Sequence, residues 1–159
     1  MLKIKFLVID VDGTLTDGKI YMGCQGEVCK AFHVRDGYGI LHLAMPNAIL
    51  PVILTGRESR IVENRCKELD ITEIYQGVSD KLSKLRQIAE DFSQVAYMGD
   101  DLNDLTCMQA VKAEGGLTGC PRDAAKEIIA VADCVTEHRG GEGAVRDFIE
   151  WLLSYPKIK

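Results

Sequence analysis

Short apolar runs alternate with helical patterns along most of this sequence, and this alternation restricts the possible fold more than any other feature. The ranges 3–9, 51–54, 74–76 and 95–98 contain the apolar runs, which are typical of buried strands. Apolar residues recur at helical spacing in the ranges 37–45, 61–69, 82–92, 102–108, 125–129 and 145–153. Strand and helix in alternation predict an α/β fold, a doubly wound parallel sheet with helices on both faces.

One segment interrupts this alternation. Two strand-like stretches, 19–22 and 27–33, flank the turn-forming residues 23–26 and predict a β-hairpin inserted at about 16–33. The chain of 159 residues is long enough for one core and too short for two ordinary domains. We therefore expect a single domain over 1–159 without a large cap domain.

Composition excludes several classes of protein. The net charge of −5 is opposite to that of a typical nucleic-acid-binding surface. The longest apolar run, 48–54, contains Pro51 and is too short to span a membrane, and Asp10 follows the first run too closely for a secretory signal. Six cysteines without a C-x-x-C pair favour free thiols in a reducing cytoplasm over a zinc site or a disulfide framework.

Acidic and polar residues follow the predicted strands. Because ligands bind beyond the carboxyl ends of the strands in a doubly wound sheet, these residues should share one edge. They are Asp10, Asp12 and Gly13 after the first strand, Thr55, Gly56 and Arg57 after the second, Lys81 after the third, and Asp100, Asp101 and Asp104 after the fourth.

Each of these residues also has a purely structural interpretation, as a turn residue, a helix cap or a solvated charge. Several carboxylates at one edge repel each other, however, and a hard divalent cation such as Mg²⁺ would relieve that repulsion. Mg²⁺ commonly binds phosphate, Lys81 and Thr55 could hold phosphate oxygens, and Gly13 and Gly56 would let backbone N–H groups approach an anion. An aspartate can attack phosphorus, and a nearby acid can protonate the leaving oxygen.

The motifs resemble those of the haloacid dehalogenase (HAD) superfamily, in order and over nearly the whole chain. They are Asp10-Val-Asp12-Gly-Thr, Leu-Thr55-Gly-Arg, Lys81 and Gly-Asp100-Asp-Leu-Asn-Asp104. The resemblance implies a Rossmann-like HAD fold in which Asp10 is the nucleophile and Asp12 the general acid and base. It also implies Mg²⁺ held by Asp10, by the backbone carbonyl of Asp12 and by Asp100, with Asp104 as a supporting ligand.

The hairpin region and the C-terminal part are similar to the capless branch of this superfamily, on the segments 16–18, 26–27, 30–40, 54–59 and 138–146. That branch includes the phosphatases of 3-deoxy-D-manno-octulosonate 8-phosphate (KDO 8-phosphate) and of nonulosonate 9-phosphates. The resemblance implies an acidic sugar phosphate as substrate and a homotetramer whose neighbouring chains complete each site. Arg57 resembles the KDO 8-phosphate group, whereas Thr14 stands where many of its members carry Val.

Several alternatives remain open from the sequence. The substrate could be a nonulosonate 9-phosphate, or the chain could be a receiver-like phospho-acceptor module or a non-catalytic assembly domain. Arg57 and Arg35 could be ordinary surface charges or could bind the carboxylate of a sugar. The glycine-rich segment 140–143 could be a plain loop before the last helix or a mobile tail that covers a neighbouring site.

Overall fold

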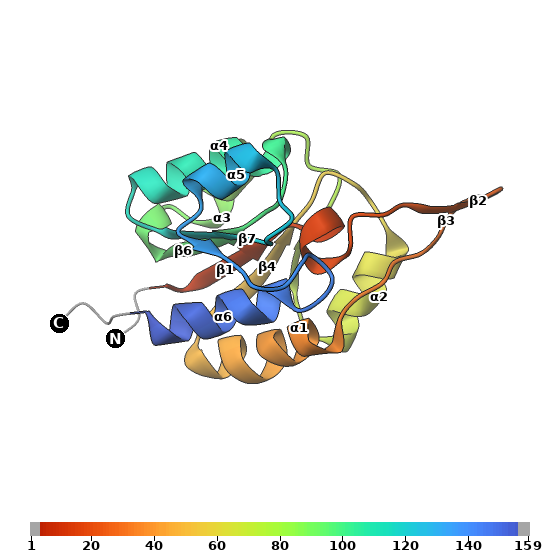
Figure 1. Cartoon of the computed structure of the whole chain (residues 1–159), viewed down its shortest axis with the longest axis horizontal. Helices are drawn as coiled ribbons and strands as arrows, with labels where there is room; N and C mark the ends of the chain where they lie inside the picture. The colour runs from red at the N-terminus through yellow and green to blue at the C-terminus, as the bar shows by residue number, and fades with distance from the viewer. Residues whose placement is uncertain (1–3, 156–159) are drawn as a thin grey trace.

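A six-stranded parallel sheet forms the centre of the molecule, in a computed structural model that describes residues 4–155 (Figure 1). Its order is β5-β4-β1-β6-β7-β8. The strands are β1 (Phe6–Ile9), β4 (Leu50–Leu54), β5 (Glu73–Tyr75), β6 (Val95–Met98), β7 (Leu117–Cys120) and β8 (Cys134–Val135). The chain runs outward from β1 on one side and returns through β6 on the other, so the predicted doubly wound sheet is confirmed.

Helices cover both faces of this sheet (Figure 1). On one face lie α1 (Val34–Gly39) with its extension through η2 (Ile40–Ala44) and η3 (Met45–Asn47), α2 (Arg60–Glu68) and α6 (Ala144–Ser154). On the other lie α3 (Lys81–Ile88), η4 (Phe92–Gln94), α4 (Leu102–Ala113) and α5 (Lys126–Val131). This two-sided cover explains why the central strands are apolar at every position rather than at every second one.

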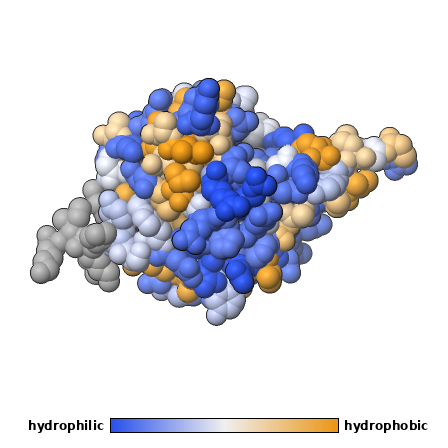
Figure 2. Space-filling view, in the orientation of Figure 1, coloured by the Kyte–Doolittle hydropathy of each residue, from blue (hydrophilic) through white to orange (hydrophobic). Residues whose placement is uncertain are grey.

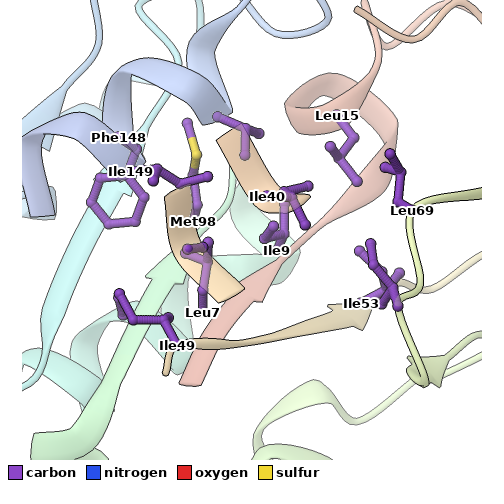
Figure 3. Close-up of a cluster of buried hydrophobic side chains, with 14 of the residues drawn as sticks. Leu7, Ile9, Leu15, Ile40, Ile49, Ile53, Leu69, Met98, Phe148 and Ile149 are labelled. Atoms are coloured by element: carbon purple, nitrogen blue, oxygen red, sulfur yellow. The ribbon is translucent and has the colours of Figure 1, made fainter. Parts of the chain in front are cut away.

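The strands divide their side chains between two apolar clusters. In β1, Leu7 and Ile9 point toward α1 and α6, where they pack with Met98 and Phe148 (Figure 3). Val8 points to the opposite face and joins the cluster beneath α3 and α4. This alternation follows from the two-residue period of a strand, and it fixes β1 in the middle of the core.

Two strands and one helix boundary differ from the sequence prediction. The sequence predicted four parallel strands and missed β7 and β8. The β7 sequence, Leu-Thr-Gly-Cys, contains a polar residue and a glycine and therefore does not look like an apolar run. The buried Thr118 hydroxyl is tolerated there because it donates to Asp133 Oδ2 over 2.9 Å. The helix predicted over 82–92 ends at Ile88, and Phe92 begins the separate turn η4, for which the Asp91 side chain accepts the Ser93 N–H.

The predicted hairpin is present as β2 (Tyr21–Gly23) and β3 (Gly26–Cys29), an antiparallel pair that projects from the body of the molecule (Figure 1). Ile20, Met22 and Val28 on it are exposed, and apolar surface is visible along the projection (Figure 2). The strand-like stretch predicted over 27–33 is shorter in the structure, where β3 ends at Cys29. Phe32 lies beyond the end of β3 and packs against the main core.

Two further features bear on the composition argument. Within residues 4–155, no helix is long and apolar enough to cross a bilayer. All six cysteines are free: Cys66, Cys107 and Cys120 are buried, Cys134 is half-buried, and Cys24 and Cys29 are exposed on the hairpin.

Candidate active site

The acidic residues meet at the carboxyl ends of β1 and β6, the point where the strand order of the sheet reverses. Asp10 directly follows β1, and Asp100 follows the neighbouring β6 after one glycine. One oxygen each of Asp10, Asp100 and Asp104 lie within 4.8 Å of one another. The Lys81 ammonium lies between two of them, with Nζ 2.7 Å from Asp10 Oδ1 and 2.8 Å from Asp104 Oδ1. Residues from three separate parts of the chain thus form one largely buried, charged cluster.

The turn η1 (Val11–Leu15) shapes the approach to this cluster. Gly13 has a φ of +97°, and a Cβ atom there would lie 2.0 Å from Asp100 Oδ2, so only glycine fits. The Thr14 hydroxyl donates to Asp100 Oδ1 over 3.1 Å. The Gly13 N–H donates to the Thr16 hydroxyl over 3.3 Å. Gly13 therefore allows the close contact between the turn and Asp100, and its predicted contact with an anion stays a prediction.

Asp104 is completely buried and is held from three sides. Besides Lys81, the Tyr97 hydroxyl donates to its Oδ1 over 2.7 Å, and the Asp100 N–H donates to its Oδ2 over 3.2 Å. Sequence analysis missed Tyr97, because a tyrosine in the apolar strand β6 looks like an ordinary core residue. Its hydroxyl adds a second donor to Asp104 Oδ1, which also accepts from Lys81.

The cluster has an excess of negative charge. Burial raises the pKa of the Asp10 carboxyl, and the Asp104 charge adds to this effect while Lys81 opposes it. Burial also raises the pKa of Asp100, and the Asp10 and Asp104 charges raise it further. Three carboxylates against one ammonium offer hard oxygen donors and a surplus of negative charge, which fits a small divalent cation such as Mg²⁺.

An open cavity of about 430 Å³ lies in front of this cluster. It is lined by Asp10, Asp12, Gly18, Thr55, Gly56, Arg57, Asp100, Asp101, Leu102 and Asn103. Lys81 and Asp104 are not among these residues, because both are buried and contact Asp10 or Asp100 instead. Three of the four strand ends that the sequence predicted to meet, those after β1, β4 and β6, therefore contribute to one cavity, and Lys81 after β5 contacts Asp10 in the acidic cluster.

Arg35 is the predicted site residue that is found neither in the lining of this cavity nor in the acidic cluster. It lines a different cavity, together with Glu137, His138 and Arg146 near the start of α6. Arg35 lies in α1, and the hairpin formed by β2 and β3 separates α1 from β1 along the sequence.

The glycine-rich segment before α6 packs on the same turn as the acids. The Gly141 N–H donates to the Thr14 carbonyl over 3.2 Å, and a Cβ atom at Gly140 would lie 1.9 Å from the Gly13 carbonyl oxygen. In this chain the segment is a loop that precedes α6 and packs against residues 13–17, whereas its predicted contact with a neighbouring site stays a prediction. It supports the active-site turn of its own chain.

Comparison with known proteins gives strong matches, although no family model matches the chain. The 3-deoxy-D-manno-octulosonate 8-phosphate phosphatase KdsC of Escherichia coli K12 is 47% identical over 154 residues, which cover 94% of this chain and 79% of that protein. The KdsC protein of Yersinia pestis is 44% identical, with 94% and 80% covered.

Solved structures agree with these sequence matches. The 3-deoxy-D-manno-octulosonate 8-phosphate phosphatase of Moraxella catarrhalis, in complex with magnesium, phosphate and KDO, has a TM-score of 0.88 and 38% identity, with 96% of this chain and 87% of that chain covered. A Legionella pneumophila protein assigned to the HAD superfamily hydrolases, subfamily III A, has a TM-score of 0.87 and 36% identity, with 96% and 84% covered.

Three findings define the class of protein: the parallel sheet, the acids at the point where its strand order reverses, and these matches. The chain is a HAD-superfamily hydrolase. Within that class it belongs to the family of 3-deoxy-D-manno-octulosonate 8-phosphate phosphatases. Both resemblances inferred from the sequence are thereby confirmed. A receiver-like module would need a phospho-acceptor aspartate at the end of the third parallel strand, which is β5 here. Gln76 and Gly77 follow β5 instead, so this alternative is not favoured.

Proposed function

We propose that this chain is a Mg²⁺-dependent phosphomonoesterase that hydrolyses KDO 8-phosphate through an aspartyl-phosphate. One observation carries the proposal: Asp10 and Asp12 line the same cavity, and Asp10 is bonded to Lys81 beside Asp100 and Asp104. The relatives that carry this activity in their names support the choice of substrate, since they match almost the whole chain.

In the first half of the reaction, an oxygen of the Asp10 carboxylate attacks phosphorus and the bond between phosphorus and the sugar oxygen breaks. Asp12 gives its proton to the departing oxygen, because a sugar alkoxide is a poor leaving group without one. Thr55 and the Gly56 backbone, which line the cavity, hold the phosphoryl oxygens, and Lys81 holds the attacking carboxylate through its contact with Asp10 Oδ1. The product of this half is an aspartyl-phosphate on Asp10 and a free sugar.

In the second half, Asp12 removes a proton from water, whose oxygen attacks the same phosphorus. The bond between phosphorus and Asp10 breaks, which releases phosphate and restores the carboxylate. Asp10, Asp100 and the Asp12 backbone carbonyl would hold Mg²⁺, with Asp104 in support. When bound, Mg²⁺ supplies positive charge that stabilises the transferring phosphoryl group.

Arg57 is our candidate for recognition of the sugar carboxylate. Its side chain is 48% exposed and lines the cavity, where a guanidinium can form paired hydrogen bonds with a carboxylate. A nonulosonate 9-phosphate would offer the same two charged ends on a longer chain. Steady-state kcat/KM values for KDO 8-phosphate, nonulosonate 9-phosphates and hexose phosphates test the choice, and a preference for hexose phosphates would refute it.

We also propose that the whole chain 1–159 is one domain that works as a homotetramer in the cytoplasm. Exposed Ile20, Met22 and Val28 support the assembly, because a lone two-stranded ribbon cannot bury them. A neighbouring chain would then supply the missing wall of the open cavity and bring Arg35 to the substrate. Six free cysteines support a reducing compartment.

The Asp10→Asn variant tests the chemistry directly. It should remain folded and lose nearly all Mg²⁺-dependent turnover, because an amide cannot form the acyl-phosphate. The matched control is Asp80→Asn, at an exposed helix cap where Asp80 Oδ1 accepts the Ser83 N–H over 3.0 Å and asparagine caps equally well. Substantial turnover by Asp10→Asn, or full activity of the wild type in chelator, would overturn the proposal.

A further inference from the structure

A buried lysine from the hairpin region contacts the proposed acid and base. Lys30 follows β3, and its Nζ atom lies 2.5 Å from Asp12 Oδ1 and 2.8 Å from Glu27 Oε1. Its side chain is only 1% exposed. An ammonium group withdrawn from water is costly unless it is paired, so the two carboxylates are what hold Lys30 in this position.

The other contacts of this group attach the hairpin to the strand ends. Glu27 Oε2 accepts the Ser59 hydroxyl over 2.7 Å, and the Ser59 N–H donates to Gln76 Oε1 over 2.9 Å. Arg57 approaches the second oxygen of Asp12, but Nε remains 3.8 Å away and its side chain is half exposed. Lys30 is therefore the closest cation to the Asp12 carboxylate, and the whole group joins β3 to the loops after β1 and β4.

Lys30 is badly placed to contact the substrate itself. It is not among the residues that line the cavity, and its exposed fraction leaves no room for a phosphate contact. Asp12, in contrast, lines the cavity and is 19% exposed. An effect of Lys30 on proton transfer therefore passes through Asp12, whose carboxylate its ammonium contacts directly.

We propose that Lys30 is a positioning residue, which holds the Asp12 carboxyl group in the orientation required for proton transfer to the leaving oxygen. The proposal rests on the proposed function of Asp12 as general acid. Proton transfer depends steeply on geometry, so a carboxyl group that is free to rotate transfers its proton less often. The hairpin thereby contributes to catalysis within its own chain, independently of any role in assembly.

The test compares two aryl phosphates that differ in how much their leaving oxygen needs a proton. Phenyl phosphate releases a more basic oxygen than p-nitrophenyl phosphate, so loss of a general acid slows it more. We expect Lys30→Met to lower kcat/KM for phenyl phosphate about 10- to 100-fold and for p-nitrophenyl phosphate less than about threefold. Because kcat/KM covers only the steps up to formation of the aspartyl-phosphate, water attack does not enter.

Three further variants make the outcome decisive. Asp12→Asn should give the same discrimination to a larger degree, and adding Lys30→Met to it should cause no further loss, since both act on one step. Lys19→Met removes an exposed lysine near the start of the hairpin and should leave both substrates unaffected. Lys30→Gln replaces Lys30→Met if circular dichroism shows the latter to be unfolded.

Each result has a distinct meaning. Equal losses on both substrates, or an additive loss in the double variant, would assign Lys30 a structural role only and overturn the inference. Failure of Asp12→Asn to discriminate between the substrates would refute the general-acid role of Asp12, and the inference would fall with it.

Discussion

Asp36 is a buried acid outside the active site, and its environment predicts a measurable dependence of stability on pH. It lies in α1 with 1% of its surface exposed, and its Oδ1 accepts the Arg146 N–H over 2.9 Å. The second oxygen, Oδ2, has no hydrogen-bond partner among the described residues. Burial raises the pKa of Asp36 from 3.8 to about 6, although the hydrogen bond from the Arg146 backbone opposes the rise.

The sign and size of the effect follow from this pKa. The folded chain binds the Asp36 proton more tightly than the unfolded chain does, so stability decreases as pH rises from about 4 to about 6. Two pKa units correspond to about 3 kcal/mol in total, of which about 2 kcal/mol develops between pH 4.5 and pH 8. Asp36→Asn keeps an oxygen for the Arg146 N–H and removes the titration.

Urea unfolding of the wild type and of Asp36→Asn at pH 4.5 and pH 8 measures the effect. The free energy of unfolding of the variant, relative to wild type, should increase by about 2 kcal/mol between these two pH values. Because burial is the main cause, 0.5 M NaCl should leave this increase nearly unchanged. A relative stability that stays constant with pH, or that changes in the opposite direction, would refute the reasoning.

Three further predictions concern the site and the assembly. Asp100→Ala should abolish activity or raise the Mg²⁺ concentration for half-maximal activity at least tenfold, and Ca²⁺ should support the wild type poorly; metal titrations of turnover check both. Gly140→Ala should lower kcat/KM at least tenfold and also lower the Tm, because its Cβ atom would displace the Gly13 carbonyl; unchanged values would show that the loop does not support the turn. Met22→Glu, on a side chain that is 64% exposed, should convert a tetramer to smaller species in light scattering and reduce turnover, whereas full turnover by a wild-type monomer of 17.6 kDa would contradict the shared site.

The sequence by itself determined the class of fold and the edge of the sheet where the acids meet. Each central strand is covered on both faces, so every residue of a run such as Phe6–Ile9 is apolar, and the run can be recognised in the sequence. Parallel strands place all their carboxyl ends at one edge, and this rule alone brings Asp10, Thr55 and Asp100 to one cavity. The chemistry of the residue types then favoured a phosphate and a divalent cation.

Only the tertiary structure decided which distant residues support that site. Nothing near Lys30 in the sequence indicates that its ammonium reaches Asp12, and Tyr97 looks like any core residue until its hydroxyl meets Asp104. The short strand β7 is likewise invisible as an apolar run, because the Phe148 ring of α6 covers Gly119 and leaves no space for a larger residue there. Local burial repeats with the period of a strand or helix and can be read along the chain, whereas such contacts depend on how elements far apart in sequence pack together.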